Sequence, residues 1–279
     1  MSEKEIEDLK TLIKSLDIRL RNEEITHEEY SDLKRKYEEK LQLEISLAKE
    51  KSFLKDLSYI SISGSGKITN SYISISGSGK VEGWRGGTIA ISGSGKISDD
   101  EIKVSGSAKL PGDLKTHTVK ASGSLKADGS LESTIFVCSG SCKINGSLIA
   151  HDSAKISGSG KIDGSILAGR VVSSGSIKVN GNIKCREAEL NGSYKIEESI
   201  ECQEYFRSEL ESKSSIDGDL ICGGNITIEI SKGNGRLNVN QIISQGEVYI
   251  EGVTADYVSG RVVKIGKECN IGKVEETSK

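Results

Sequence analysis

The chain has 279 residues, a net charge of −3, 35% apolar residues and only 4% aromatic residues. This charge balance gives no indication of a nucleic-acid partner, and so few aromatic residues are unusual in a globular enzyme. The chain contains 32 glycines but a single proline, Pro111, which argues against bulk disorder. No apolar stretch follows Met1, so we expect a cytoplasmic protein with reduced cysteines, without a signal peptide or membrane insertion.

The first part of the chain, residues 1–57, has the pattern of a helical hairpin. Apolar residues recur at helical spacing between Ile6 and Leu20 and again from Tyr30 onward. Between them, Thr26 and Glu29 are spaced as a capping box that begins the second helix. We expect this domain to cap the rest of the chain or to mediate oligomerisation. Self-packing is the favoured interpretation, with the solenoid end or another copy as alternatives. The candidate helical interface consists of Leu9, Leu16, Tyr30, Leu33 and Tyr37.

The second part, residues 58–279, contains a Ser/Asn-Gly-Ser-x-Lys motif that recurs nine times. From residue 122 onward the motif begins at residues 122, 139, 157, 174 and 191, which is a period of 17 or 18 residues. A fixed period of this length indicates stacked repeats, none of which can bury its apolar face alone. The first motifs lie 13 to 16 residues apart, so we expect that end to be narrower or irregular.

Aligning the repeats gives three nearly apolar columns. The residues before the motif are Ile62, Ile75, Ile91, Val104, Ala121, Cys138, Ile156, Ser173 and Leu190. The residues after the lysine are Ile68, Val81, Ile97, Leu110, Ala127, Ile144, Ile162, Val179 and Ile196. A third column holds Ala150, Ala168, Cys185, Cys202 and Cys222. Period-2 alternation within short segments then predicts strands whose column residues point inward.

These patterns predict a mainly β fold, a single-stranded parallel β-helix of about 13 coils with an N-terminal α-helical hairpin. Glycines are expected at the corners, where a positive φ costs them little. The motif lysines should form an outward ladder, neutralised by Glu82, Asp128, Asp163 and Glu197, two positions after a lysine. An anionic partner along that ladder is the alternative interpretation.

Residues with catalytic or binding chemistry do not form a recognisable site. The recurring GSGK tetrapeptide lacks the single strand-to-helix setting of a phosphate loop, because Gly66-Lys67 is followed by Ile68. The column of Cys185, Cys202 and Cys222 lacks the paired spacing of a zinc site and is interpreted as a stack of small apolar side chains. We therefore predict no enzymatic activity, no cofactor and no metal.

The repeated coils, such as ISGSGKI at Ile62–Ile68, resemble those of the bactofilins, polymer-forming cytoskeletal proteins, over residues 59–274. This resemblance implies a cytoplasmic, right-handed β-helix that polymerises without nucleotide and scaffolds other proteins. The helical segment LKSLDIRLRNEEITHEEYSDLKRKYEEKL also resembles the short helical modules of SHOCT type. That second resemblance implies a role in oligomerisation or as an adaptor.

We therefore expect a cytoskeletal scaffold whose partners are other copies of itself and protein cargo, without nucleic acid. The alternative is a discrete adaptor, monomeric or dimeric, in which the hairpin recruits a partner and the β-helix is a spacer. Phe53, Leu54 and Leu57 lie at the end of the helical region and are expected to cover the first coil. The C-terminal coil has no such cover, so Val263, Ile265 and Ile271 are the candidate self-association surface.

Overall fold

The computed structural model describes residues 3–22, 24–27, 29–38, 41, 59–68, 72–84, 87–98, 100–231 and 233–277. The chain divides into two compact units, Met1–Asp56 with Thr69–Tyr72, and Leu57–Ile68 with Ile73–Lys279. The fold is mainly β, with 64% of residues in strands, and the described part of the second unit forms a β-solenoid of about 10 turns. The predicted fold class is confirmed, although the number of turns is smaller than the 13 expected.

The helical unit contains α1 (Glu3–Arg21), followed by a second helical segment that includes residues 29–38. The predicted capping box is present, because the Glu29 amide donates to Thr26 Oγ1 at 3.2 Å and the Thr26 amide donates to Glu29 Oε2 at 2.9 Å. The Tyr30 hydroxyl donates to Asp17 Oδ1 at 2.7 Å, which ties the second helical segment to α1. Phe53, Leu54 and Leu57, expected to cover the first coil, lie outside the described residues.

The solenoid begins with long hairpin strands, which explains the smaller number of turns. These strands are β1 (Tyr59–Ile68), β2 (Tyr72–Trp84) and β3 (Gly87–Ser98). β1 pairs antiparallel with β2, and β3 pairs antiparallel with β4 (Glu101–Val104) and β5 (Ser107–Leu110). A spacing of 13 residues between motifs is too short for a full turn, so the first repeats fold back on one another instead of coiling.

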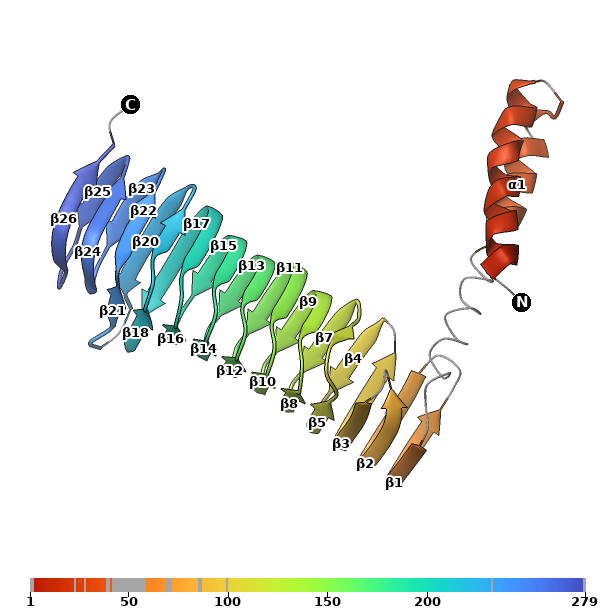
Figure 1. Cartoon of the computed structure of the whole chain (residues 1–279), viewed down its shortest axis with the longest axis horizontal. Helices are drawn as coiled ribbons and strands as arrows, with labels where there is room; N and C mark the ends of the chain where they lie inside the picture. The colour runs from red at the N-terminus through yellow and green to blue at the C-terminus, as the bar shows by residue number, and fades with distance from the viewer. Residues whose placement is uncertain are drawn as a thin grey trace. The chain divides into compact units, whose positions relative to one another are not determined.

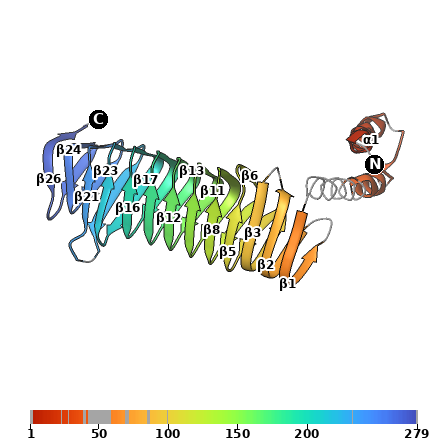
Figure 2. The ribbon, with the colours of Figure 1, turned by 60° about the horizontal axis from the view of Figure 1, so that its bottom comes forward.

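From β4 onward the strands stack in parallel, one turn above another (Figure 1). The strands that carry the motif pair in one column, side by side in Figure 2. They are β5, β8 (Ser124–Ala127), β10 (Ser141–Ile144), β12 (Ser159–Ile162), β14 (Ser176–Val179) and β16 (Ser193–Ile196). Two strands without the motif, β18 (Lys213–Ile216) and β21 (Arg236–Val239), continue the column.

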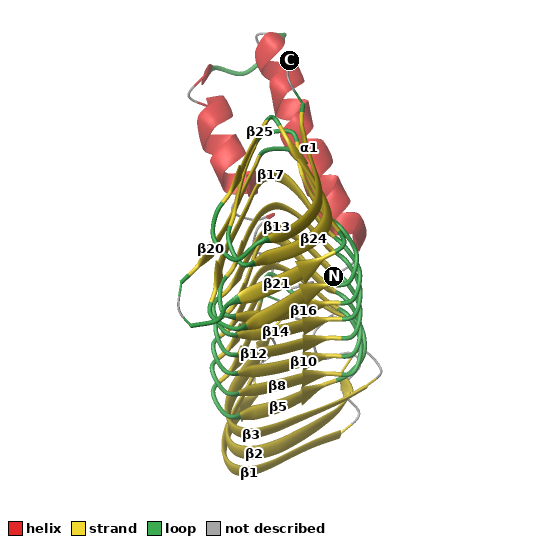
Figure 3. Ribbon diagram, turned by 90° about the vertical axis from the view of Figure 1, so that its left-hand side faces the viewer, coloured by secondary structure: helices red, strands yellow, loops and turns green. Residues whose placement is uncertain are grey.

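The rest of each turn forms the other two sides of the coil, seen down the stack in Figure 3. Several of these strands bend midway, as at the register break between Ala150 and Ser153. They are β6 (Leu114–Lys115), β7 (Thr118–Ala121), β9 (Leu131–Cys138), β11 (Leu148–Ile156), β13 (Ile166–Ser173), β15 (Ile183–Leu190), β17 (Ile200–Leu210), β19 (Leu220–Cys222), β20 (Asn225–Ile230), β22 (Gln241–Ser244) and β23 (Glu247–Ile250). The last turn comprises β24 (Val253–Gly260), β25 (Val262–Ile265) and β26 (Asn270–Glu276).

The predicted apolar columns form the core of the parallel turns. In the column after the lysine, Leu110, Ala127 and Ile144 are in register on successive turns and fully buried. In the third column, Ala150, Ala168 and Cys185 pair in the same way, and Cys202 and Cys222 continue the stack. Identical positions therefore stack in register, which is what makes the short repeat sufficient to define the fold.

The motif glycines of the regular turns are required for a reason other than the one predicted. Positive φ angles occur at Gly64, Gly77, Gly93 and Gly192, but not at the motif glycines of the regular turns between them. A Cβ atom at Gly140 would instead lie 2.0 Å from the carbonyl oxygen of Gly123 on the turn below. Close stacking of adjacent turns, and not a left-handed backbone, therefore excludes a side chain at these corners.

Candidate functional site

From Lys109 onward the motif lysines form a continuous outward ladder, as predicted. Lys67, Lys80 and Lys96 are not in register with one another, because the first strands pair antiparallel and place Ser74, Ser61 and Lys103, respectively, opposite them. Lys109, Lys126 and Lys143 lie in register on neighbouring turns, and Lys161, Lys178 and Lys195 extend the row. Asp128 accepts from both Lys109 at 3.1 Å and Lys126 at 3.3 Å, so one carboxylate bridges two turns. Asp163 contacts Lys161, Glu197 contacts Lys178 and Lys195, and Glu82 contacts Lys80. The acidic partners predicted from the sequence are therefore in place.

These ion pairs give the solenoid a pH dependence with a defined sign. Hydrogen bonds from Lys109, Lys161 and Lys178 lower the pKa values of Asp128, Asp163 and Glu197, respectively. Carboxyl groups with a depressed folded-state pKa contribute stability above their unfolded pKa of about 4, and that stability is lost as the pH falls through the folded value.

We therefore expect the melting temperature to be constant from neutral pH to about pH 5 and to fall at lower pH. The pairs are partly exposed, so the loss per pair should be small and should shrink in high salt. Calorimetry across this range checks the effect. A melting temperature that stays constant down to pH 2 would contradict the assigned pairs.

The cysteine column is buried, and its thiols are held close together. All six cysteines are free, and Cys185 Sγ lies 3.5 Å from Cys202 Sγ on the next turn. The pKa of the Cys202 thiol is raised mainly by its hydrogen bond with Cys185 and, to a smaller extent, by burial. Burial also raises the pKa of the Cys222 thiol. No group of three metal-ligating His, Cys, Asp or Glu side chains occurs among the described residues.

Thiol labelling of the folded protein should distinguish these cysteines. Cys269 is half-buried, whereas the other five are buried. Since reagents react with accessible thiolates, we expect one thiol per chain to react fast with a disulfide reagent and five to react slowly. The Cys269→Ser variant should lose the fast phase alone. Rapid labelling of Cys185, Cys202 and Cys222 in the folded chain would refute their inward placement.

The candidate self-association residues lie on the last turn, where the core columns end. Val263 and Ile265 on β25 stand next to Val248 and Ile250, both buried one turn below. Ile271 on β26 stands next to Ala255 in the same way. Val263 and Ile271 are half-buried, and Ile265 is 45% exposed.

A fourth residue of this end, Val274, was missed in the sequence. Val274 is 42% exposed, while its neighbour Val258 on the turn below is buried. Strict alternation from Ile271 would place Val274 on the opposite face, so only its pairing with Val258 on the turn below identifies it as part of this end. Val263, Ile265, Ile271 and Val274 are together called the terminal patch.

One backbone amide on the edge of β25, that of Val263, donates its hydrogen bond to a side chain of the same chain. The Val263 amide donates to the Glu276 side chain, Oε1, at 2.9 Å. The next backbone contact, from the Thr277 amide to the Gly260 carbonyl at 2.9 Å, holds the end of the chain beside this edge. A side chain, and not another strand, thus satisfies this amide in the single chain.

The residues of the predicted helical interface are divided between buried and half-buried positions. Leu9 and Leu16 are buried in the single chain, and Tyr30, Leu33 and Tyr37 are half-buried. Burial of both leucines agrees with self-packing, the favoured interpretation of the hairpin. Leu12 and Ile18 on α1 are exposed instead. No helix among the residues that the structure describes is long and apolar enough to cross a membrane.

The fold defines a solenoid repeat protein whose last described turn leaves Ile265 and Val274 exposed. Comparison with known families adds a specific match, since residues 136–237 fit the Bactofilin family model, described as polymer-forming cytoskeletal. The resemblance predicted from the repeats is confirmed over this segment, which spans turns of the parallel solenoid. No curated protein and no solved structure matches the chain. The resemblance of the hairpin to SHOCT modules stays a prediction.

Proposed function

We propose that this protein is a non-enzymatic cytoskeletal scaffold that self-associates end to end through its solenoid, without nucleotide. The observation that carries the proposal is the terminal patch, where core columns continue onto a last turn whose Ile265 and Val274 are exposed among the described residues. Burying a Val or Ile side chain contributes about 1.5–3 kcal/mol relative to leaving it exposed, so four partly exposed residues favour pairing. The match to a polymer-forming family supports the same function.

The contact is a pairing of two C-terminal ends related by a two-fold axis. A two-fold contact brings the same patch of two copies together, so the exposed core of one end covers that of the other. The edge of β25 can then exchange its Glu276 contact for a strand of the second copy. If the hairpins also pair, dimers extend into filaments; if they do not, assembly stops at the dimer. We place this assembly in the cytoplasm, with protein cargo on its sides.

The second candidate function is a discrete adaptor that recruits a partner through the hairpin. The exposed Leu12 and Ile18 on α1 favour it, because each offers a large apolar side chain that a protein partner could bury. In that case the solenoid is a spacer.

Electron microscopy of the purified full-length protein, without nucleotide, distinguishes the two functions. The scaffold proposal expects filaments or rods of doubled length that appear as protein concentration rises. Single rods at all concentrations would overturn end-to-end association and favour the adaptor.

A further inference from the structure

One side of the solenoid carries an outward row of residues that is complementary to the same row read in the opposite direction. The row is made by Ile149, Leu167, Lys184, Glu201, Ile221 and Ile243, on β11, β13, β15, β17, β19 and β22. Each residue is the register partner of the next, so the six lie on six successive turns. The row, called here the palindromic row, is thus two apolar residues, a base, an acid and two apolar residues.

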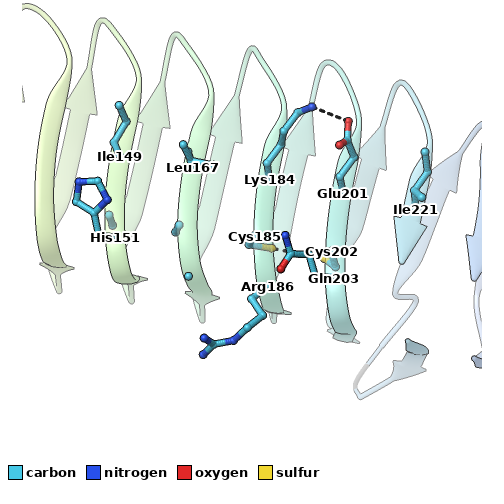
Figure 4. A pocket seen from close by; sticks show the side chains of 13 residues that line it. Ile149, His151, Leu167, Lys184, Cys185, Arg186, Glu201, Cys202, Gln203 and Ile221 are labelled. Carbon is cyan, nitrogen blue, oxygen red and sulfur yellow. Dashed lines mark hydrogen bonds and ion pairs between the residues drawn. The ribbon is translucent and has the colours of Figure 1, made fainter. Parts of the chain in front are cut away.

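The row borders a groove on the surface (Figure 4). Leu167 is 52% exposed and Ile221 is 39% exposed, and they flank the central ion pair of Lys184 and Glu201 at 3.0 Å. His151, Arg186 and Gln203 line the groove beside the row. Arg186 also contacts Glu204 on the next turn at 3.3 Å, so the neighbouring row has the same order of charges.

We infer that this face binds a second copy of the chain side by side and antiparallel. A two-fold axis between the turns of Lys184 and Glu201 places Lys184 opposite Glu201 of the other copy. The same axis places Leu167 opposite Ile221 and Ile149 opposite Ile243. In the neighbouring row, Arg186 of one copy then faces Gln203 and Glu204 of the other copy. Each of these six positions therefore meets a chemically matched position. Beyond them, the same axis brings Glu132, next to Ile149 in register, to the level of Ser259, next to Ile243.

A parallel, in-register pairing is disfavoured by the same charges. It would bring Lys184 against Lys184 and Glu201 against Glu201, and like charges held together oppose association. The row thus specifies both the partner and its direction.

The contact between two rods is small, so it holds copies together only where many such contacts act at once. Six turns at about 4.8 Å span roughly 24 Å, and a strip about 12 Å wide gives on the order of 300 Å² per partner. Stable interfaces bury about 800 Å² per partner, so two isolated rods associate weakly. This inference rests on the proposed function, in which rods are joined end to end. The lateral contact then repeats along two neighbouring filaments, and the binding free energies of the repeated contacts add up. The expected product is paired filaments.

Cysteine cross-linking of full-length protein tests the direction of the contact. In a Cys269→Ser background, Leu167→Cys and Ile221→Cys proteins are oxidised separately and as a mixture at high concentration. The antiparallel contact predicts a cross-linked dimer in the mixture, several-fold above either protein alone. Identical cysteines would be three turns apart, roughly 14 Å, beyond the Cα separation of about 7 Å that a disulfide spans. Efficient self-cross-linking of each single variant, or none in any sample, overturns the inference.

Charge reversal supplies the matched control. Lys184→Glu should reduce the mixed cross-link several-fold, and Lys184→Glu with Glu201→Lys should restore it, because both opposed pairs are again complementary. Failure of the double variant to restore it, with unchanged melting, also overturns the inference. Filaments without cross-links would refute this contact alone, whereas cross-links without filaments or doubled rods would refute the proposed function alone.

Discussion

Replacing Ile265 by lysine is expected to abolish end-to-end assembly without unfolding the chain. Ile265 is partly exposed on β25, so a lysine there can extend into solvent in the single chain. On pairing, each copy would lose the burial of an isoleucine and bring a charge into the contact, where an unpaired charge costs several kcal/mol. We expect sedimentation to show association weakened by at least about 100-fold, which corresponds to about 2.8 kcal/mol.

The matched control is Leu167→Lys, which places the same charge on an exposed apolar position of β13, away from the end. This variant should keep end-to-end assembly. If Ile265→Lys assembles like the unmodified protein, and assembly disappears instead on deletion of residues 1–55, the hairpin end is the one that associates.

Replacing Ile144 by aspartate is expected to destabilise the solenoid by several kcal/mol. Ile144 is fully buried on β10, in register with Ala127 below and Ile162 above. A carboxylate at this place has no partner between the stacked apolar side chains, and an unpaired buried charge is strongly destabilising. Chemical denaturation should show a large decrease in the unfolding midpoint.

The neighbouring residue provides the control, because Lys143 on the same strand points outward and is exposed. Lys143→Ala should change the midpoint only slightly. Equal midpoints for Ile144→Asp and the unmodified chain would show that the column is not part of the core.

Repetition explains how much of this fold the sequence could predict. The column containing Ala127, Ile144 and Ile162 follows from alignment of the motifs alone, because each turn there has 17 or 18 residues and carries the motif at the same place. The lysine ladder and its acidic neighbours follow from the same alignment. Three residues of the terminal patch, Val263, Ile265 and Ile271, could be located because the columns reach the last strands.

The features that were missed depend on pairing, which a local motif does not encode. The motifs at Ser63 and Ser76 read like the later ones, yet β1 and β2 pair antiparallel. The requirement for Gly140 comes from a carbonyl on the turn below. The palindromic row requires the register between Glu201, Ile221 and Ile243, where the turns lengthen beyond the regular period.

The position of the C-terminus within the assembled particles tests end-to-end scaffolding most directly. Gold particles attached to a C-terminal tag of the full-length protein locate this end by electron microscopy. Tail-to-tail pairing predicts labels in close pairs, at the centre of a rod of doubled length or at intervals of two rod lengths along a filament. Single labels at the free ends of dimers, or labels at intervals of one rod length, would contradict pairing through the terminal patch.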